Sequence, residues 1–202
     1  MQFDREKLKA TILYTCQRCE QDQLGAVKLH KVLYFSDMLR FIQSGHPITG
    51  STYRKRPLGP TCDQLLSTLS DLESAGMLEI QNVDYFGYIK KAYIPLVIAP
   101  VERLSKSDIS LLDAVIEFVC NNNSAKTISE FSHNKAWELA EFGDVLPYTS
   151  AFRLLPMQVT PETMEWATKQ GAAVEHIKST TSDLGLKPFG DLRRRVLERT
   201  GR

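Results

Sequence analysis

The first part of the chain repeats hydrophobic and polar residues with the spacing of amphipathic helices. Asp4 is a capping residue type, and the apolar stripe after it predicts a helix over residues 4–20. A second helix should start after Gly25 and end at Gly45 and Pro47, because glycine and proline interrupt helices. The stripe of this second helix recurs every three or four residues, at Leu29, Val32, Leu33, Ser36 and Leu39.

The pattern then changes from helical to β-like. Residues 61–64 (TCDQ) fit a capping box, which predicts a third helix that stops at Gly76. β-branched and aromatic residues dominate residues 77–99, with Asn82 and Gly87 as turn residues, so we expect a β-ribbon of two or three strands. A helix, a glycine stop and a ribbon in this order resemble the second half of a winged helix.

Helical spacing returns after the ribbon. Ser105 and Asp108 form a capping pattern ahead of an amphipathic segment, which the three asparagines at 121–123 should end. Residues 127–130 (TISE) form another capping box and predict a buried helix that carries His133 and Trp137.

A short helix is expected to open at Pro147 or Tyr148 and to end near residue 155. The pattern as a whole predicts a mainly α (α+β) fold. We expect a compact helical domain with a small antiparallel β-ribbon and a winged-helix-like element.

Pro156 marks a change in the pattern, so we expect a domain at 1–156 and a C-terminal extension at 157–202. Thr160 and Pro161 should start a helix that runs to about residue 169. Residues 187–202 hold six basic and two acidic residues, a balance that attracts phosphates or an acidic protein. A docking helix and a mobile terminus are the alternatives for this tail.

Composition narrows the class of protein. The chain is 43% hydrophobic and 24% charged, which is typical of a globular protein with a sizeable core. Its net charge of +1 gives no overall attraction to nucleic acid or membranes. The sequence shows neither a signal-peptide pattern nor a run long enough to span a membrane, so we expect a cytoplasmic protein.

Four cysteines in 202 residues do not make a disulfide framework. Cys16 and Cys19 have the spacing of a redox or zinc pair, but a zinc site needs four ligands, and Cys62 and Cys120 stand alone. We therefore interpret Cys16 as a core residue of the first helix and Cys19 as a surface one. No cofactor or metal is predicted.

The adjacent Ser132 and His133 suggest a hydrolase at first sight. Neighbours on a helix point about 100° apart, so they do not form a nucleophile–base pair by themselves. The sequence has no Gly-x-Ser-x-Gly elbow and no glycine-rich phosphate loop. The sequence therefore favours a protein that is not an enzyme.

The densest internal basic run is Arg54-Lys55-Arg56, between Tyr53 and the rigid turn at 57–60. Arginine and tyrosine are favoured anchors at protein interfaces. We therefore expect the loops around this run to face a partner, with a nucleic-acid patch or a solvated loop as the alternatives. The candidate partner-binding residues are Tyr53, Arg54, Lys55, Arg56, Leu58, Gly59, Pro60 and His46.

Several motifs in order resemble the SocA-like, or Panacea-domain, antitoxin family. They are KLHKVLYFSDM at 28–38, GHPITG at 45–50 and RPLGP at 56–60, followed by Ser132-His133 and Trp137. Gly143 and Pro147-Tyr148 complete the set, and the resemblance covers residues 4–155. The chain departs from the family where an Ala-Trp-x-x-Gly-Pro approach is usual, because residues 53–60 here are more basic and lack the tryptophan.

The resemblance implies a non-enzymatic, mostly helical antitoxin that neutralises a cognate protein toxin by direct binding. It also implies a structural role for the motif residues Lys28, Leu29, Tyr34, His133 and Trp137. Related domains occur in phage and mobile-element proteins, so an accessory role there is an alternative.

Two other classes of function remain open from the residues. A nucleic-acid-binding regulator would place the helix at 62–75 in a groove, although Asp63, Asp71 and Glu73 on its solvent face would repel phosphate. A hydrolase would depend on Ser132 or His133. The sequence predicts no oligomeric state.

Overall fold

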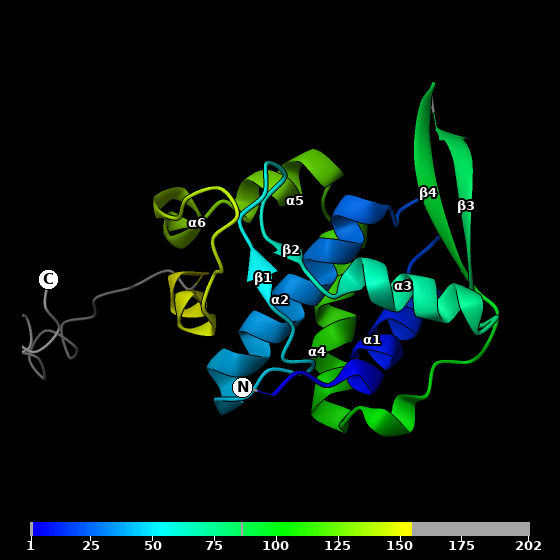
Figure 1. Ribbon diagram of the computed structural model, residues 1–202, viewed down its shortest axis with the longest axis horizontal. Coiled ribbons are helices and arrows are strands. Elements are labelled where there is room, and N and C mark those ends of the chain that lie inside the picture. The colour runs from blue at the N-terminus through cyan, green and yellow to red at the C-terminus, as the bar shows by residue number, and fades with distance from the viewer. Residues whose placement is uncertain (1, 86, 155–202) are drawn as a thin grey trace, which may run out of the picture. The chain divides into compact units, whose positions relative to one another are not determined.

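The computed structural model describes residues 2–85 and 87–154 of the chain (Figure 1). The helices and strands follow in the order α1 (Arg5–Arg18), α2 (Ala26–Ser44), β1 (Tyr53–Arg54), β2 (Thr61–Cys62), α3 (Leu65–Ser74), β3 (Leu78–Tyr85), β4 (Tyr88–Pro95), α4 (Lys106–Ile116), α5 (Ala125–Phe131) and α6 (Lys135–Leu139). Short 3-10 helices lie at Val101–Arg103 and Tyr148–Leu154, and a π turn at Glu117–Asn121 follows α4. The predicted mainly α class with a small β-ribbon is confirmed.

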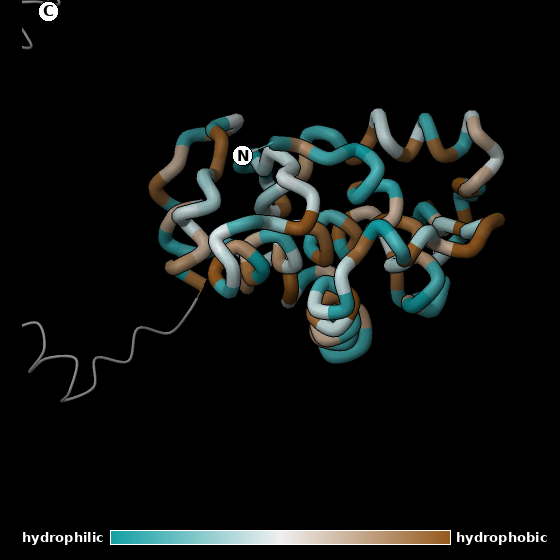
Figure 2. Tube along the Cα trace, turned by 90° about the horizontal axis from the view of Figure 1, so that it is seen from below, coloured by the Kyte–Doolittle hydropathy of each residue, from teal (hydrophilic) through white to brown (hydrophobic). Residues whose placement is uncertain are grey.

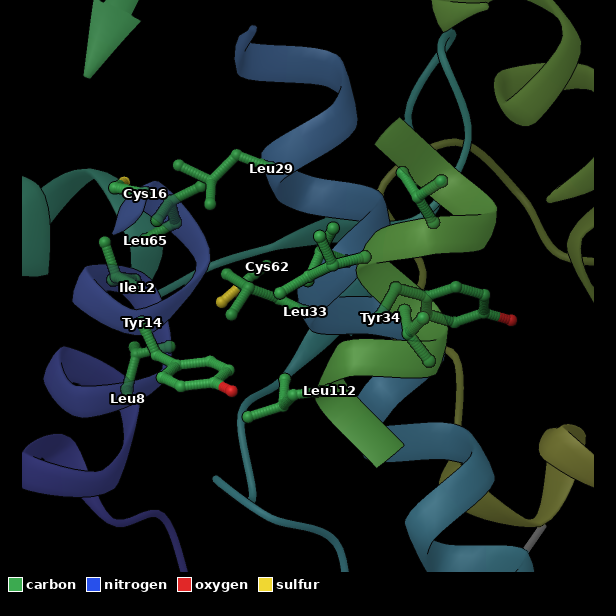
Figure 3. Packing of buried hydrophobic residues seen from close by; sticks show 14 of the residues in the cluster. Leu8, Ile12, Tyr14, Cys16, Leu29, Leu33, Tyr34, Cys62, Leu65 and Leu112 are labelled. Carbon is green, nitrogen blue, oxygen red and sulfur yellow. The ribbon is translucent and has the colours of Figure 1, made fainter. Parts of the chain in front are cut away.

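Helix α2 forms the centre of the domain. Helices α1, α4 and α5, strand β2 and the 3-10 helix at Tyr148–Leu154 all pack against it. Leu29 and Leu33 of α2 meet Leu8 of α1 and Leu112 of α4 in one hydrophobic cluster (Figure 3). The bounds of α2 agree with the prediction, since Gly25 is its N-cap and Gly45, with a φ of 75°, ends it.

The caps of the other long helices also follow the sequence. The Asp4 carboxylate accepts from the Lys7 N–H at 2.9 Å at the start of α1. Ser105 and Asp108 form the complete capping box that was predicted for α4. Figure 2 shows hydrophobic and hydrophilic residues interspersed along the chain. Helix α2 is buried at every residue from Lys31 to Met38, as its central position requires.

The β-ribbon has two strands. β3 and β4 pair antiparallel from Leu78↔Pro95 to Tyr85↔Tyr88. The chain enters the ribbon from α3 through Gly76, which has a positive φ of 66° as the sequence predicted. The ribbon stands beside the helices, next to α1 and α3 (Figure 1).

The predicted start of α3 is wrong. Thr61 and Cys62 are not a helix cap but strand β2, which pairs antiparallel with β1. The Gln64 side chain accepts from the Thr52 N–H at 2.9 Å, across the hairpin, and not from the expected cap position. The contact with β1 therefore takes precedence over the local capping pattern, and the helix begins at Leu65.

The predicted buried helix through His133 and Trp137 is also wrong. Ser124 caps α5, which ends at Phe131, and Asn134 caps the separate α6 by accepting from the Trp137 N–H. His133 lies in the break between α5 and α6, and the rings of His133 and Trp137 are half-buried.

Cys19 and Cys120 form a disulfide, which contradicts the interpretation of Cys19 as a surface residue and of Cys120 as solitary. Cys19 caps the end of α1, and the π turn after α4 carries Cys120 to it across 101 residues of sequence. Cys16 is a free buried cysteine, as expected.

No helix within residues 2–85 and 87–154 is long and apolar enough to cross a membrane. The helix expected at 160–169 and the basic tail at 187–202 lie outside the described residues.

A polar cluster is embedded in this apolar core at Asp37 of α2, which is fully buried. Its carboxylate accepts hydrogen bonds from the Thr49 N–H at 2.8 Å, the Thr49 hydroxyl at 2.5 Å, the Tyr53 hydroxyl at 2.9 Å and the Tyr148 hydroxyl at 3.0 Å. Burial raises the pKa of the Asp37 carboxyl, while these four hydrogen bonds act to lower it.

Replacing Asp37 with alanine removes the acceptor from all four donors and leaves the buried Thr49 N–H without this partner. We expect Asp37→Ala to lower the free energy of unfolding by about 3 kcal/mol. The matched control is Asp71→Ala, which breaks the exposed ion pair with Arg5 and should lower it by about 0.5 kcal/mol. Urea denaturation followed by circular dichroism measures both, and equal losses would contradict the structural role of Asp37.

Candidate functional site

The hairpin made of β1, β2 and the loop between them carries most of the predicted partner-binding residues. Its first residue, Tyr53, is only 1% exposed. The Tyr53 hydroxyl donates to the Leu33 carbonyl and to Asp37, both of α2, and its ring packs edge-on against Tyr34 at 5.4 Å between centroids. Tyr53 therefore anchors the hairpin to α2. The expectation that Tyr53 faces a partner is wrong, because its ring is buried in the core.

The far end of this loop is also fastened to α2. The buried Lys31 ammonium donates to the Pro60 carbonyl at 3.0 Å, and the Ser129 hydroxyl of α5 donates to the Leu58 carbonyl at 2.9 Å. Burial lowers the pKa of Lys31 to about 7. Gly59 and Pro60 are buried under these contacts, so they hold the loop in place.

Gly59 is required here for two reasons. Its φ of 91° lies in the left-handed region that favours glycine. A Cβ atom at this position would collide with the Ser132 Oγ and would lie 2.7 Å from the Lys31 Nζ. The Gly-Pro motif therefore marks a close approach of the loop backbone to α2 and α5.

The sequence pattern did not identify Lys31 as a residue that holds the loop at Pro60. The available signal was a lysine three residues after Lys28, on the helix that carries the strongest apolar stripe. Both side chains are buried and donate to carbonyls, since the Lys28 ammonium donates to the Cys120 carbonyl at 2.8 Å. A buried lysine needs such a partner, because an unpaired charge is costly to remove from water.

The basic run is used inside the protein. The Arg54 guanidinium pairs with Asp63 at 2.6 Å and donates to the Gly143 carbonyl at 3.0 Å. The Lys55 ammonium donates to the Ala140 carbonyl at 3.0 Å and lies 4.2 Å from the centre of the Trp137 ring.

Arg56 completes the same attachment. Its guanidinium lies over the Phe142 ring at 5.2 Å, and its carbonyl accepts from the Trp137 indole N–H at 3.3 Å. Backbone hydrogen bonds join Lys55 to Gly143 and Asp144, and Tyr53 to Leu146. The three basic side chains thus fasten the segment 137–146 to the hairpin of β1 and β2.

His133 and Trp137 stack with their rings 3.7 Å apart and nearly parallel, at 7°. Burial lowers the pKa of His133, and the charge of the nearby Lys31 lowers it further. The buried Ser132 hydroxyl donates to the Ser129 carbonyl at 2.6 Å, and within the described part of the chain His133 Nε2 has no hydrogen-bond partner. The serine is therefore oriented into its own helix end and not toward the imidazole.

The remaining candidates do not form one surface. Leu58 is 58% exposed at the tip of the β1–β2 loop and, with Val27 and His133, borders a pocket of about 350 Å³. His46 is exposed beyond the other end of α2. Lys31, which holds Pro60, and Ser44, which precedes Gly45-His46, are about 20 Å apart along the helix axis.

Among residues 2–85 and 87–154, no group of three or more histidine, cysteine or acidic side chains is arranged to hold a metal ion.

The close approach at Gly59 predicts a large difference between two glycine positions. Gly59→Ala should lower the free energy of unfolding by about 3 kcal/mol, because it combines backbone strain with the collision against Ser132 and Lys31. Gly45→Ala is the control, since Gly45 also has a positive φ but an added methyl group there would have no heavy atom within 4 Å, and it should lower stability by about 1 kcal/mol. Similar values in chemical denaturation would contradict the close approach.

Lys31 predicts a pH dependence of stability. Its pKa is about 7 in the folded state and about 10.4 in the unfolded chain, so between these values the unfolded state binds one more proton. Stability therefore rises with pH in this window, by up to about 1.4 kcal/mol per pH unit, and the penalty is complete below pH 7.

We expect Lys31→Met to lose this contribution, so its free energy of unfolding relative to wild type should fall from pH 7 to pH 9. Denaturation of both proteins in parallel measures the difference, which removes the effects of other titrating groups. A difference that stays constant across this range would show that Lys31 remains charged in the folded protein.

One comparison with known proteins identifies a family. A family model described as antitoxin SocA-like, Panacea domain, matches residues 29–138, just over half of the chain. The match is narrower than the predicted 4–155 and runs from α2 to α6, including the β1–β2 loop, the ribbon and the stacked pair His133 and Trp137. No curated protein and no solved structure gave a significant match. On the strength of the family match, this chain belongs to the SocA-like antitoxin family that carries the Panacea domain.

Proposed function

We propose that this protein is the antitoxin of a toxin–antitoxin pair and that it neutralises its cognate protein toxin by direct binding. The observation that carries the proposal is the match to the antitoxin family over residues 29–138. We place the toxin and this protein in the cytoplasm. Thiols are kept reduced there, so we expect Cys19 and Cys120 to be packed thiols under those conditions.

Binding without enzymatic chemistry is supported by how the polar side chains of the site are used. The basic run, Lys31 and Ser132 all contact other parts of the same chain. Catalysis by Ser132 would need a base within hydrogen-bond reach, and its hydroxyl instead donates to a carbonyl at the end of α5. The basic run, Lys31 and Ser132 therefore support a structural role of these side chains in a binding protein.

Nucleic-acid binding through the winged-helix-like element has less support. α3 carries the exposed Glu73 and the Asp71 carboxylate, and Asp63 lies just before it. Asp63 and Asp71 pair with Arg54 and Arg5, so Glu73 is the carboxylate among them that phosphates would repel.

The test is co-expression with the product of the adjacent gene. Both genes are placed under unrelated promoters, so that any rescue cannot come from repression of the toxin gene. We expect the neighbour alone to arrest growth, this protein to restore growth, and the two to co-elute as a stable complex in size-exclusion chromatography.

Two measurements separate binding from enzymatic reversal. Rescue by binding requires stoichiometric amounts of this protein, and mass spectrometry should recover the toxin at its unmodified mass. Growth arrest that persists although both proteins are soluble and equally abundant would refute the proposal. Rescue by trace amounts would point to catalysis.

A further inference from the structure

The β-ribbon has one long open edge. In an antiparallel pair, residues alternate between those whose backbone N–H and C=O groups face the other strand and those whose groups face away from it. The Met77 carbonyl accepts from the Leu96 N–H at 2.9 Å, one step before β3 and in the same register. Every second residue from Met77 onward therefore faces β4, and the backbone groups of Ile80, Asn82 and Asp84 face outward.

The outward groups of β3 are not used by the rest of the domain. In the described part of the chain, residues 2–85 and 87–154, no backbone hydrogen bond joins Ile80, Asn82 or Asp84 to another segment. Asn82 and Asp84 are exposed, and Ile80 is half-buried. A strand edge with unpaired donors and acceptors is ready to pair with a strand of another chain.

The edge of β4 is less open than the edge of β3. β4 lies on the side of the ribbon that faces α1 and α2, and β3 lies on the far side (Figure 1). The Lys90 ammonium donates to the Gln21 carbonyl at 3.0 Å and to the Asp22 carbonyl, which ties β4 to the turn before α2. Pro95, at the base of β4, has no N–H to donate. β3 has neither a proline nor a lysine, the residues that commonly protect an edge strand.

The spacing of the outward groups selects an extended peptide. Two residues of a strand rise by about 6.7 Å, so the donors and acceptors of β3 repeat at that distance. An added strand presents its own groups at the same spacing, whereas a helix uses its backbone groups internally. An isolated two-stranded ribbon is only marginally stable in water, so a third strand would also stabilise it.

We propose that the cognate toxin adds an extended segment as a third strand to the outer edge of β3, through main-chain hydrogen bonds to Ile80, Asn82 and Asp84. This inference rests on the proposed function, because it names the surface through which the antitoxin binds. It moves the contact surface away from the basic run at residues 54–56, whose side chains contact other parts of the same chain.

A second copy of this chain fits the edge less well. In a symmetric pair of β3 strands, β4 would separate each β3 from its own α1 and α2, so the two copies would touch mainly through their edge strands. Each β3 has eight residues, whereas a stable interface uses roughly 20–30 residues on each side. A toxin is not constrained by this symmetry and can extend from the edge over Ile89, which is 84% exposed and pairs with Asp84.

Proline substitution tests the edge, because proline has no main-chain N–H. Asn82→Pro removes an outward donor and leaves the hydrogen bonds to β4 in place, at the kind of position where strands tolerate proline. Asn82→Ala keeps the N–H and controls for loss of the side chain. Lys91→Pro is the matched control, since Lys91 pairs in register with Asn82 and its N–H faces outward on the opposite edge.

The probe is the purified product of the adjacent gene, and calorimetry measures its Kd for each variant. We expect Asn82→Pro to weaken binding about tenfold or more, because a main-chain hydrogen bond is lost and the proline ring blocks the added strand. Asn82→Ala and Lys91→Pro should change the Kd by less than about twofold. Circular dichroism and the melting temperature check that the three variants fold.

Amide hydrogen exchange, measured by NMR on the wild-type protein, gives a second readout that needs no variant. We expect the amides of Ile80, Asn82 and Asp84 to exchange quickly in the free protein and at least about tenfold more slowly in the complex. The Lys91 amide, on the opposite edge, should not change. This measurement decides the question if Asn82→Pro does not fold.

The outcomes separate the two proposals. If wild type binds the probe but Asn82→Pro binds equally well, or the outward amides of β3 are not slowed in the complex, the strand pairing is wrong and the antitoxin function stands. If wild type does not bind at all, the proposed function fails and this inference fails with it. If the same amides slow in the protein alone as its concentration rises, and light scattering shows a dimer, the occupant is a second copy and the proposal is overturned.

Discussion

The buried carboxylate of Asp37 is the constraint on which the arrangement of the domain depends. A carboxylate is costly to bury unless donors surround it, and here the donors come from three separate segments. Thr49 follows α2, Tyr53 begins β1, and Tyr148 opens the 3-10 helix at Tyr148–Leu154, 111 residues from Asp37 in sequence. An alternative packing that displaced any of them would leave part of this polar group unsatisfied, so the cluster selects one arrangement of the chain.

Lys28 and Lys31 apply the same principle nearer the start of α2. Each is buried with its ammonium group on a backbone carbonyl, one at Cys120 and one at Pro60. Helix α2 therefore combines an apolar stripe with three charged side chains that each specify a long-range partner. The motif at 28–38 is better understood as the framework of the domain than as its contact surface.

This changes how the basic run should be understood. Arg54, Lys55 and Arg56 were expected to face a partner because arginine is a favoured anchor at protein interfaces. In the fold they contact Asp63, the carbonyls of residues 140 and 143, and two aromatic rings. Large apolar side chains stay exposed instead at Leu58 on the loop and at Tyr88 and Ile89 on the ribbon.

The features that could be predicted from the sequence are those that depend on near neighbours in the chain. The caps at Asp4 and Ser105, the glycine stops at Gly45 and Gly76 and the β-ribbon all follow from interactions within a few residues, and the motif order identified the family. Local capping signals failed where a distant contact was stronger, as at Thr61, which pairs in β2.

The directions in which the site residues point depend on contacts between distant parts of the chain. Tyr53 turns inward because its hydroxyl donates to Asp37, which is 16 residues away in sequence. The Arg54 guanidinium donates to the Gly143 carbonyl, which is 89 residues away. The pairing of Cys19 with Cys120 spans 101 residues. No pattern within one helix turn or one strand carries these contacts, because they depend on how the whole chain closes around α2.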